Sequence, residues 1–145
     1  MSLSRIMPLV IAVCLTAAGC GKHAASVSGV VTFGTRPLSS GVVTFTPVGP
    51  GSSSYGNVGA DGRYSLQTGA ERGLEPGDYK VTVAANATAE EAAAMGIKIG
   101  REGIMPLLTP RRYADVATTP LTVAVKRGSQ TVDLALEPDP KGGRP

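Results

Sequence analysis

The chain has 145 residues, a length that suits one domain. Its 19 glycines, 11 prolines and lack of tryptophan favour a small β-rich domain with many turns over a helical bundle. The net charge of +3 comes from scattered basic residues without a run of five or more like charges, so the composition argues against a nucleic-acid partner.

The first residues have the pattern of an export signal. Arg5 is followed by a short apolar run, and small residues then lead to Cys20. A basic start, a short apolar core and small residues before a cleavage site are typical of a secretory signal. The run is shorter than the ~20 residues that a transmembrane helix needs. The prediction is a signal peptide at 1–19, and an ordinary signal that is cut near Ala24 stays the alternative.

Cleavage before Cys20 decides what the two cysteines can do. Cys14 falls in the discarded segment, so the mature chain keeps a single cysteine. This excludes a disulfide or a cysteine-based metal site within one mature chain. Residues 20–26 are small and polar, and we expect them to be a short tether before the folded domain.

Apolar and polar residues alternate along most of the remaining chain, which is the period-2 pattern of half-buried strands. Strands are expected at 27–33, 41–48, twice within 55–68, and at 74–85, 121–125 and 132–136. Turn-forming residues separate them at about the 8–12-residue spacing of β-sandwiches. The sequence therefore predicts an all-β, seven-stranded, Ig-like sandwich over 27–137, with a disordered tail at 138–145.

Two hairpins are expected within this sandwich. Asp61-Gly62 is a strong signal for a tight turn between two paired strands. The second hairpin is expected at 126–129, between the last two strands. Asp61 and Asp78 are both assigned to turns, where a short carboxylate accepts hydrogen bonds from nearby backbone.

Residues 86–118 interrupt the strand pattern for longer than a plain sandwich loop does. Loops beyond ~15 residues are usually functional or disordered. Within this one, Thr88 and Glu91 have the spacing of a capping box, which predicts a short helix that ends at Gly96. We expect the loop to lie across one end or face of the sandwich.

Residues suited to catalysis are scarce. His23 is the single histidine and lies on the expected tether, so no Ser/His/Asp set, Cys/His set or histidine-based zinc site can be assembled. The acidic residues do not form a calcium-loop pattern, and the glycine-rich stretches lack the lysine of a phosphate cradle. The sequence predicts no enzyme, no metal and no cofactor.

The most promising contact surface is formed by Arg111, Arg112 and Tyr113. Two guanidinium groups beside a tyrosine can pair with carboxylate or phosphate and stack on a ring. The alternative is that Tyr113 pins the long loop to the sandwich while both arginines stay in water.

A second group of residues is expected to be purely structural. It matches the sandwich pattern in which a tyrosine hydroxyl bonds to nearby backbone. Its members are Leu74, Pro76, Gly77 and Tyr79.

Residues 17–20, Ala-Ala-Gly-Cys, resemble the lipobox of bacterial lipoproteins, with the match at Ala18, Gly19 and Cys20. The resemblance implies that diacylglycerol is attached to the Cys20 thiol and that Cys20 becomes the first mature residue. It also implies a lipid anchor in a bacterial cell envelope, at the outer membrane or on the periplasmic face.

Segments 27–47, 61–66 and 74–83, in this order, resemble the carboxypeptidase regulatory-like domain, a transthyretin-like sandwich of seven strands. The segment 110–113, Pro-Arg-Arg-Tyr, resembles a Pro-x-x-Tyr motif of small lipoproteins of this type common in planctomycetes. The resemblance implies a fold and a cellular location, and it does not imply an enzymatic activity. We therefore expect a non-enzymatic binding or structural module whose partner is an envelope protein or polysaccharide. The alternative is a carrier of a small ligand or glycan on the sandwich surface.

Overall fold

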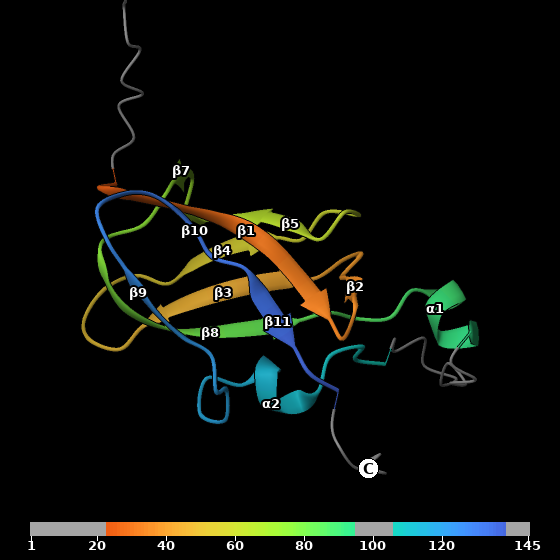
Figure 1. Cartoon of the computed structure of the whole chain (residues 1–145). Coiled ribbons are helices and arrows are strands. Elements are labelled where there is room, and N and C mark those ends of the chain that lie inside the picture. Colours follow the sequence, from red (N-terminus) through yellow and green to blue (C-terminus); the bar gives the residue numbers. More distant parts are fainter. Residues whose placement is uncertain (1–22, 95–105, 139–145) are drawn as a thin grey trace, which may run out of the picture.

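The computed structural model describes residues 23–94 and 106–138 (Figure 1). The predicted signal peptide, Cys20, Gly96 and residues 139–145 of the predicted tail lie outside this described part. Within it, the chain forms eleven strands, arranged in two sheets, and two short helices. The all-β sandwich predicted from the alternating sequence is confirmed.

The first sheet is built around β1 (Ala25–Phe33). Its other strands are β2 (Arg36–Pro37), β5 (Arg63–Ser65), β10 (Gly128–Thr131) and β11 (Leu134–Leu136). β1 pairs in parallel with β10 and β11 and antiparallel with β2 and β5. Because β1 begins at Ala25, residues 25 and 26 belong to the sheet and not to the tether.

The second sheet is antiparallel throughout and has the strand order β7-β6-β4-β3-β8-β9. Its strands are β3 (Val42–Pro47), β4 (Ser54–Asn57), β6 (Gln67–Thr68), β7 (Glu71–Arg72), β8 (Gly77–Ala84) and β9 (Thr122–Val125). The long pairing of β3 with β8 forms the middle of this sheet. Asp78 lies in β8, so its assignment to a turn is wrong.

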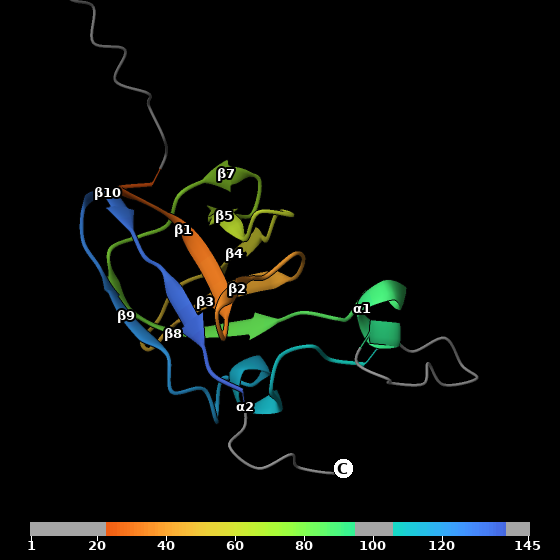
Figure 2. The same cartoon turned by 45° about the vertical axis from the view of Figure 1, so that its right-hand side comes forward.

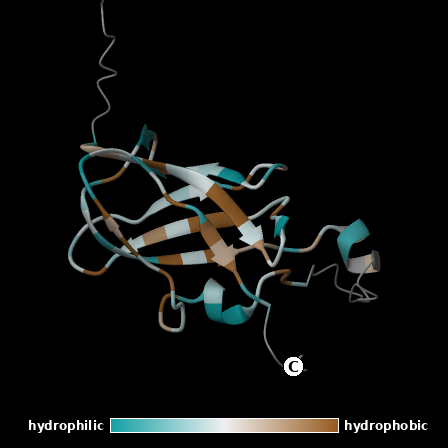
Figure 3. Cartoon of the chain, in the orientation of Figure 1, coloured by the Kyte–Doolittle hydropathy of each residue, from teal (hydrophilic) through white to brown (hydrophobic). Residues whose placement is uncertain are grey.

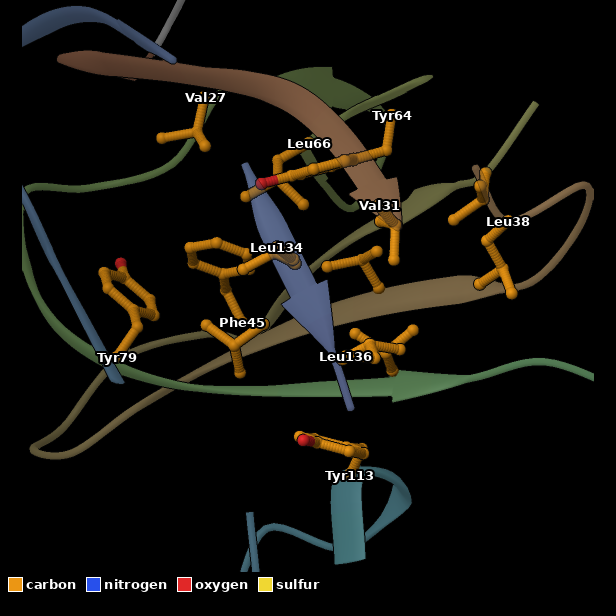
Figure 4. Close-up of a cluster of buried hydrophobic side chains, with 14 of the residues drawn as sticks. Val27, Val31, Leu38, Phe45, Tyr64, Leu66, Tyr79, Tyr113, Leu134 and Leu136 are labelled. Atoms are coloured by element: carbon orange, nitrogen blue, oxygen red, sulfur yellow. The ribbon is translucent and has the colours of Figure 1, made fainter. Parts of the chain in front are cut away.

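The core lies between the two sheets (Figure 4). Alternate residues of β3 and β8 point into it, and Val43, Phe45, Val81 and Val83 have no exposed surface. Figure 3 shows hydrophobic segments recurring along the strands of both sheets. The rings of Phe45 and Tyr79 lie 6.0 Å apart in a tilted arrangement. Burial of these alternating positions explains why the period-2 pattern located the strands.

The hairpin predicted at 126–129 is wrong. β9 belongs to the second sheet, and β10 crosses to the first, where it runs parallel to β1. At this crossing β9 and β10 do not pair, and the Gln130 side chain hydrogen-bonds to the backbone at the end of β9. It donates to the carbonyl of Ala124 at 3.2 Å and accepts from the amide of Lys126 at 3.1 Å. The left-handed backbone at Gly128, with a φ of 94°, allows the change of direction.

At Asp61-Gly62 the predicted turn forms, but the strands on either side of it do not pair. Asp61 Oδ1 accepts the Arg63 amide at 3.1 Å, and Gly62 has a φ of 82°. β4, before the turn, pairs with β3 and β6, whereas β5, after it, pairs with β1. The turn is therefore a corner between the two sheets and not a hairpin.

β10 and β11 are two parts of one strand beside β1. Ala25 pairs with Gly128 and Val31 with Leu134, so the register is the same in both parts. Between them, side chains complete the ladder. The amide of Val30 donates to Asp133 Oδ1 at 3.0 Å, and the hydroxyl of Tyr64 donates to the carbonyl of Val132 at 2.6 Å. Burial, and then the charge of Asp133, raise the pKa of Tyr64, so its hydroxyl keeps its proton and remains a donor.

The sandwich has two different ends (Figure 2). At the N-terminal end, β1 begins beside the β9–β10 turn, and the β3–β4 loop lies at the same end on the other sheet (Figure 1). At the distal end, β1 finishes near β2 and the helix α1 (Ala89–Ala94). The second helix, α2 (Arg111–Ala114), lies below β8 in Figure 1. Both helices fall within the 86–118 interruption of the strand pattern.

Candidate functional site

The structure places Arg111, Arg112 and Tyr113 on α2 and gives them different surroundings. Tyr113 is 4% exposed and belongs to the core cluster, and Figure 4 shows its ring at the edge of that cluster, on the α2 side of β8. Its hydroxyl accepts from the amide of Glu137 at 3.1 Å and from the Arg112 guanidinium at 3.3 Å. Arg112 also lies 4.8 Å from the centre of the Tyr113 ring and donates to the carbonyl of Glu137 at 2.9 Å. Together these contacts join α2 to the chain that follows β11.

This arrangement does not bring the three side chains into one contact surface. The Arg112 guanidinium is engaged with the protein itself, and Tyr113 is buried. Only Arg111 is exposed. The geometry matches the alternative in which Tyr113 pins the loop, except that Arg112 is not left in water.

The group of Leu74, Pro76, Gly77 and Tyr79 lies where β8 begins. Leu74 is fully buried, and the hydroxyl of Tyr79 donates to the carbonyl of Glu75 at 2.7 Å. Burial and the nearby Glu75 carboxylate raise the pKa of Tyr79, which keeps this donor protonated. These residues fix the entry into β8 and present no reactive group.

A cleft at the distal end is the better candidate for a site. It encloses about 370 Å³, within the size range of small-molecule pockets. We call it the distal cleft. Its lining residues are Phe33, Arg36, Pro37, Leu38, Ser39, Glu91 and Leu108. The cleft thus joins the end of β1, the connection from β2 to β3, and both described parts of the long interruption.

Glu91 fixes one wall of the distal cleft. Its carboxylate accepts the Ser39 hydroxyl at 2.6 Å and the Thr88 amide at 2.9 Å, while the Thr88 hydroxyl accepts the Glu91 amide at 3.2 Å. The reciprocal pair with Thr88 is the capping box expected from the sequence. The hydrogen bond from Ser39 and that from Thr88 lower the pKa of Glu91. The Glu91 carboxylate therefore caps the start of α1 and links this helix to Ser39, in the connection from β2 to β3.

Leu108, which also lines the cleft, is held in place by a short antiparallel stem. Its amide donates to the carbonyl of Ala85 at 2.7 Å, and the amide of Ala87 donates to that of Pro106 at 2.9 Å. The buried hydroxyl of Thr109 extends the stem, since it donates to the carbonyl of Val83 and accepts the amide of Ala85, both at 3.3 Å. Leu108 is half-buried and packs against the core, so its position is fixed.

The distal cleft combines an apolar floor with charge at its rim. Phe33 and Leu108 are half-buried, Leu38 is buried, and the Arg36 side chain is exposed. Apolar walls with a few polar groups are the usual composition of binding sites. The sequence did not single out Phe33, Arg36 or Ser39 as site residues. The one local signal was the capping box, which located Glu91 but not its contact with Ser39.

Acid should weaken the attachment of α1. Because the pKa of Glu91 is lowered in the folded state, its charge stabilises the fold above the carboxyl's unfolded pKa. This contribution is lost as the pH falls through the lowered folded pKa. We expect Glu91→Gln to speed amide exchange in α1 at neutral pH, with the difference from wild type shrinking in acid. Hydrogen exchange followed by mass spectrometry at both pH values measures this, and an undiminished difference in acid would contradict the assigned role of the charge.

Residues 23–94 and 106–138 contain no group of three His, Cys, Asp or Glu side chains that could hold a metal ion. No helix in this part is long and apolar enough to cross a membrane.

A scan against protein-family models, a search of curated proteins and a search of solved structures found no match to this chain. Membership of the carboxypeptidase regulatory-like family therefore stays a prediction from the sequence.

Proposed function

We propose that the protein is a non-enzymatic binding module of a bacterial cell envelope, anchored by lipid on Cys20, with the distal cleft as its binding site. The observation that carries this proposal is the course of β1. The strand starts two residues after His23 and ends with Phe33, which lines the cleft. At about 3.3 Å per residue, its nine residues separate the cleft from the start of the strand by roughly 25 Å. An anchor at Cys20 would thus leave the cleft facing away from the membrane.

The chemistry of the cleft supports recognition over catalysis. Both oxygens of the Glu91 carboxylate already accept hydrogen bonds, and the Ser39 hydroxyl donates to one of them. These groups hold the wall in place and are not poised as a base and a nucleophile. The exposed Arg36 is the group placed to meet an incoming anion, since guanidinium groups pair well with carboxylate and phosphate.

A fitting partner is an envelope protein or polysaccharide that offers an apolar group beside an anionic one. The apolar group would rest on Phe33 and Leu108, and the anionic group would pair with Arg36. The enclosed volume of about 370 Å³ favours a second candidate, a carrier of a small ligand or glycan. A carrier would release a small molecule, detectable by mass spectrometry, when the purified protein is denatured.

Affinity capture from envelope extract tests the binding site. Arg36→Glu should lower the recovery of bound partner or ligand about tenfold or more, because it replaces a charge-assisted contact by repulsion. Arg111→Glu is the matched control: it makes the same charge change at an exposed arginine outside the cleft. Equal losses in both variants, or none in either, would contradict the assignment of the cleft.

The anchor has its own test. Mass spectrometry of the mature N-terminus should find diacylglycerol on Cys20. An unmodified terminus that starts downstream of Cys20 would overturn the anchor without affecting the test of the cleft.

A further inference from the structure

We propose that the N-terminal end of the sandwich lies directly on the lipid bilayer, with Val48 in the interfacial region and Lys126 and Arg127 facing anionic headgroups. The inference rests on the proposed lipid anchor and adds a second, non-covalent contact with the membrane. Its occupant is a bilayer surface that contains anionic lipid.

The short tether supplies the first argument. Only three residue steps separate Cys20 from His23, so at about 3.3–3.6 Å per residue they span at most roughly 10 Å. His23 is not free to extend that reach. Its side chain is 18% exposed, and its Nδ1 lies 3.1 Å from Oε1 of Glu75. Two residues later, Ala25 bonds to Leu74 through both its amide and its carbonyl. With lipid on Cys20, the N-terminal end cannot lie far from the headgroups.

The β3–β4 loop supplies the second argument. Val48 is 65% exposed, the largest exposure among the large hydrophobic residues of the described chain. It lies in an uncharged stretch that runs from 37 to 60. A hydrogen bond of 2.9 Å from its amide to the carbonyl of Asp78 holds it at the start of β8. The loop also borders a cavity of about 570 Å³ that His23 lines, so Val48 and the tether share one end.

The β9–β10 turn supplies the third argument. Lys126 and Arg127 are exposed in this turn, and the amide of Gly128 donates to the carbonyl of Ala24 at 3.0 Å. The two cations therefore lie beside the root of the tether. Each basic residue near an anionic bilayer surface adds to the attraction, and an exposed apolar residue at the same end of the sandwich gains by entering the interface. Two acidic residues line the cavity at this end, Glu75, which faces His23, and Asp78.

The native chain contains no tryptophan, so one introduced tryptophan reports on a single place. The full chain, matured in bacterial membranes, is reconstituted into vesicles of phosphatidylcholine and phosphatidylglycerol. In Val48→Trp, we expect emission shifted to the blue and strong quenching by brominated acyl chains. In Leu107→Trp, which probes an exposed residue of the distal end, we expect emission as in water and little quenching.

A tryptophan can drive insertion by itself, so the basic turn is tested in the same background. Adding Lys126→Ser and Arg127→Ser to Val48→Trp should reduce the quenching at least twofold, and replacing phosphatidylglycerol by phosphatidylcholine should do the same. Quenching that ignores both changes overturns the proposed contact. So does a Val48→Trp protein that floats with the vesicles but stays unquenched. A chain that does not float at all counts against the lipid anchor itself, and with it against this inference.

Discussion

Tyr113→Ala is expected to lower the free energy of unfolding by about 3–5 kcal/mol, the usual cost of removing a large buried aromatic side chain. The ring is 4% exposed within the core cluster, and its hydroxyl accepts the Glu137 amide and the Arg112 guanidinium. Its loss would leave a cavity and an unpaired amide at the end of β11. Urea unfolding of the mature chain followed by circular dichroism measures the change.

Two further variants separate the parts of this effect. Tyr113→Phe keeps the ring and removes the acceptor, so a loss of about 1–2 kcal/mol is expected. Arg111→Ala, on the exposed side of the same helix, should change stability by less than about 0.5 kcal/mol. If Tyr113→Ala left stability unchanged but abolished capture of a partner, Tyr113 would belong to a contact surface and not to the core.

The strands could be predicted because burial in a sandwich depends on every second residue. Val43 with Phe45, and Tyr79 with Val81, are buried apolar residues spaced two apart, as the alternation of a half-buried strand requires. The capping box of Thr88 and Glu91 could also be predicted, since both of its hydrogen bonds lie within four residues. Both signals are local, and each is complete within a short stretch of sequence.

The pairing of the strands could not be predicted in the same way. A turn signal such as Asp61-Gly62 reports the local backbone, and the same turn serves a hairpin or a corner between sheets. At the β9–β10 turn, the side-chain amide of Gln130 donates to the carbonyl of Ala124, where a hairpin would have backbone hydrogen bonds between its strands. A period-2 pattern does not distinguish this glutamine from one that faces solvent. Whether β10 pairs with β9 or with β1 depends on β1, which lies about a hundred residues earlier in the chain and pairs in parallel with β10.

The distal cleft was missed for a related reason. Phe33, Glu91 and Leu108 lie in three separate segments, and only the folded chain brings them to one cavity. The sequence favoured Arg111, Arg112 and Tyr113 because they are consecutive. Consecutive residues on a short helix point in different directions, so Tyr113 enters the core while Arg111 faces water.

The parallel strand beside β1 depends on Gly29, and Gly29→Ala is expected to be strongly destabilising. A Cβ at this position would overlap the carbonyl oxygen of Val132, which is a backbone atom and cannot turn away. The backbone of Gly29 does not have a positive φ, so the cost would come from lack of space and not from strain. Overpacking costs about 1–3 kcal/mol and occasionally more, and a backbone clash belongs at the upper end.

The clash would also disturb the neighbouring side-chain bonds. The Val132 carbonyl accepts the Tyr64 hydroxyl, and Asp133 accepts the Val30 amide, so displacing Val132 would loosen both. Urea unfolding of Gly29→Ala should therefore show a loss of about 3 kcal/mol or more. Gly49→Ala is the control, since a Cβ there meets nothing within 4 Å and its φ is not positive. Equal stability of the two variants would mean that β10 and β11 do not lie against β1 as one strand.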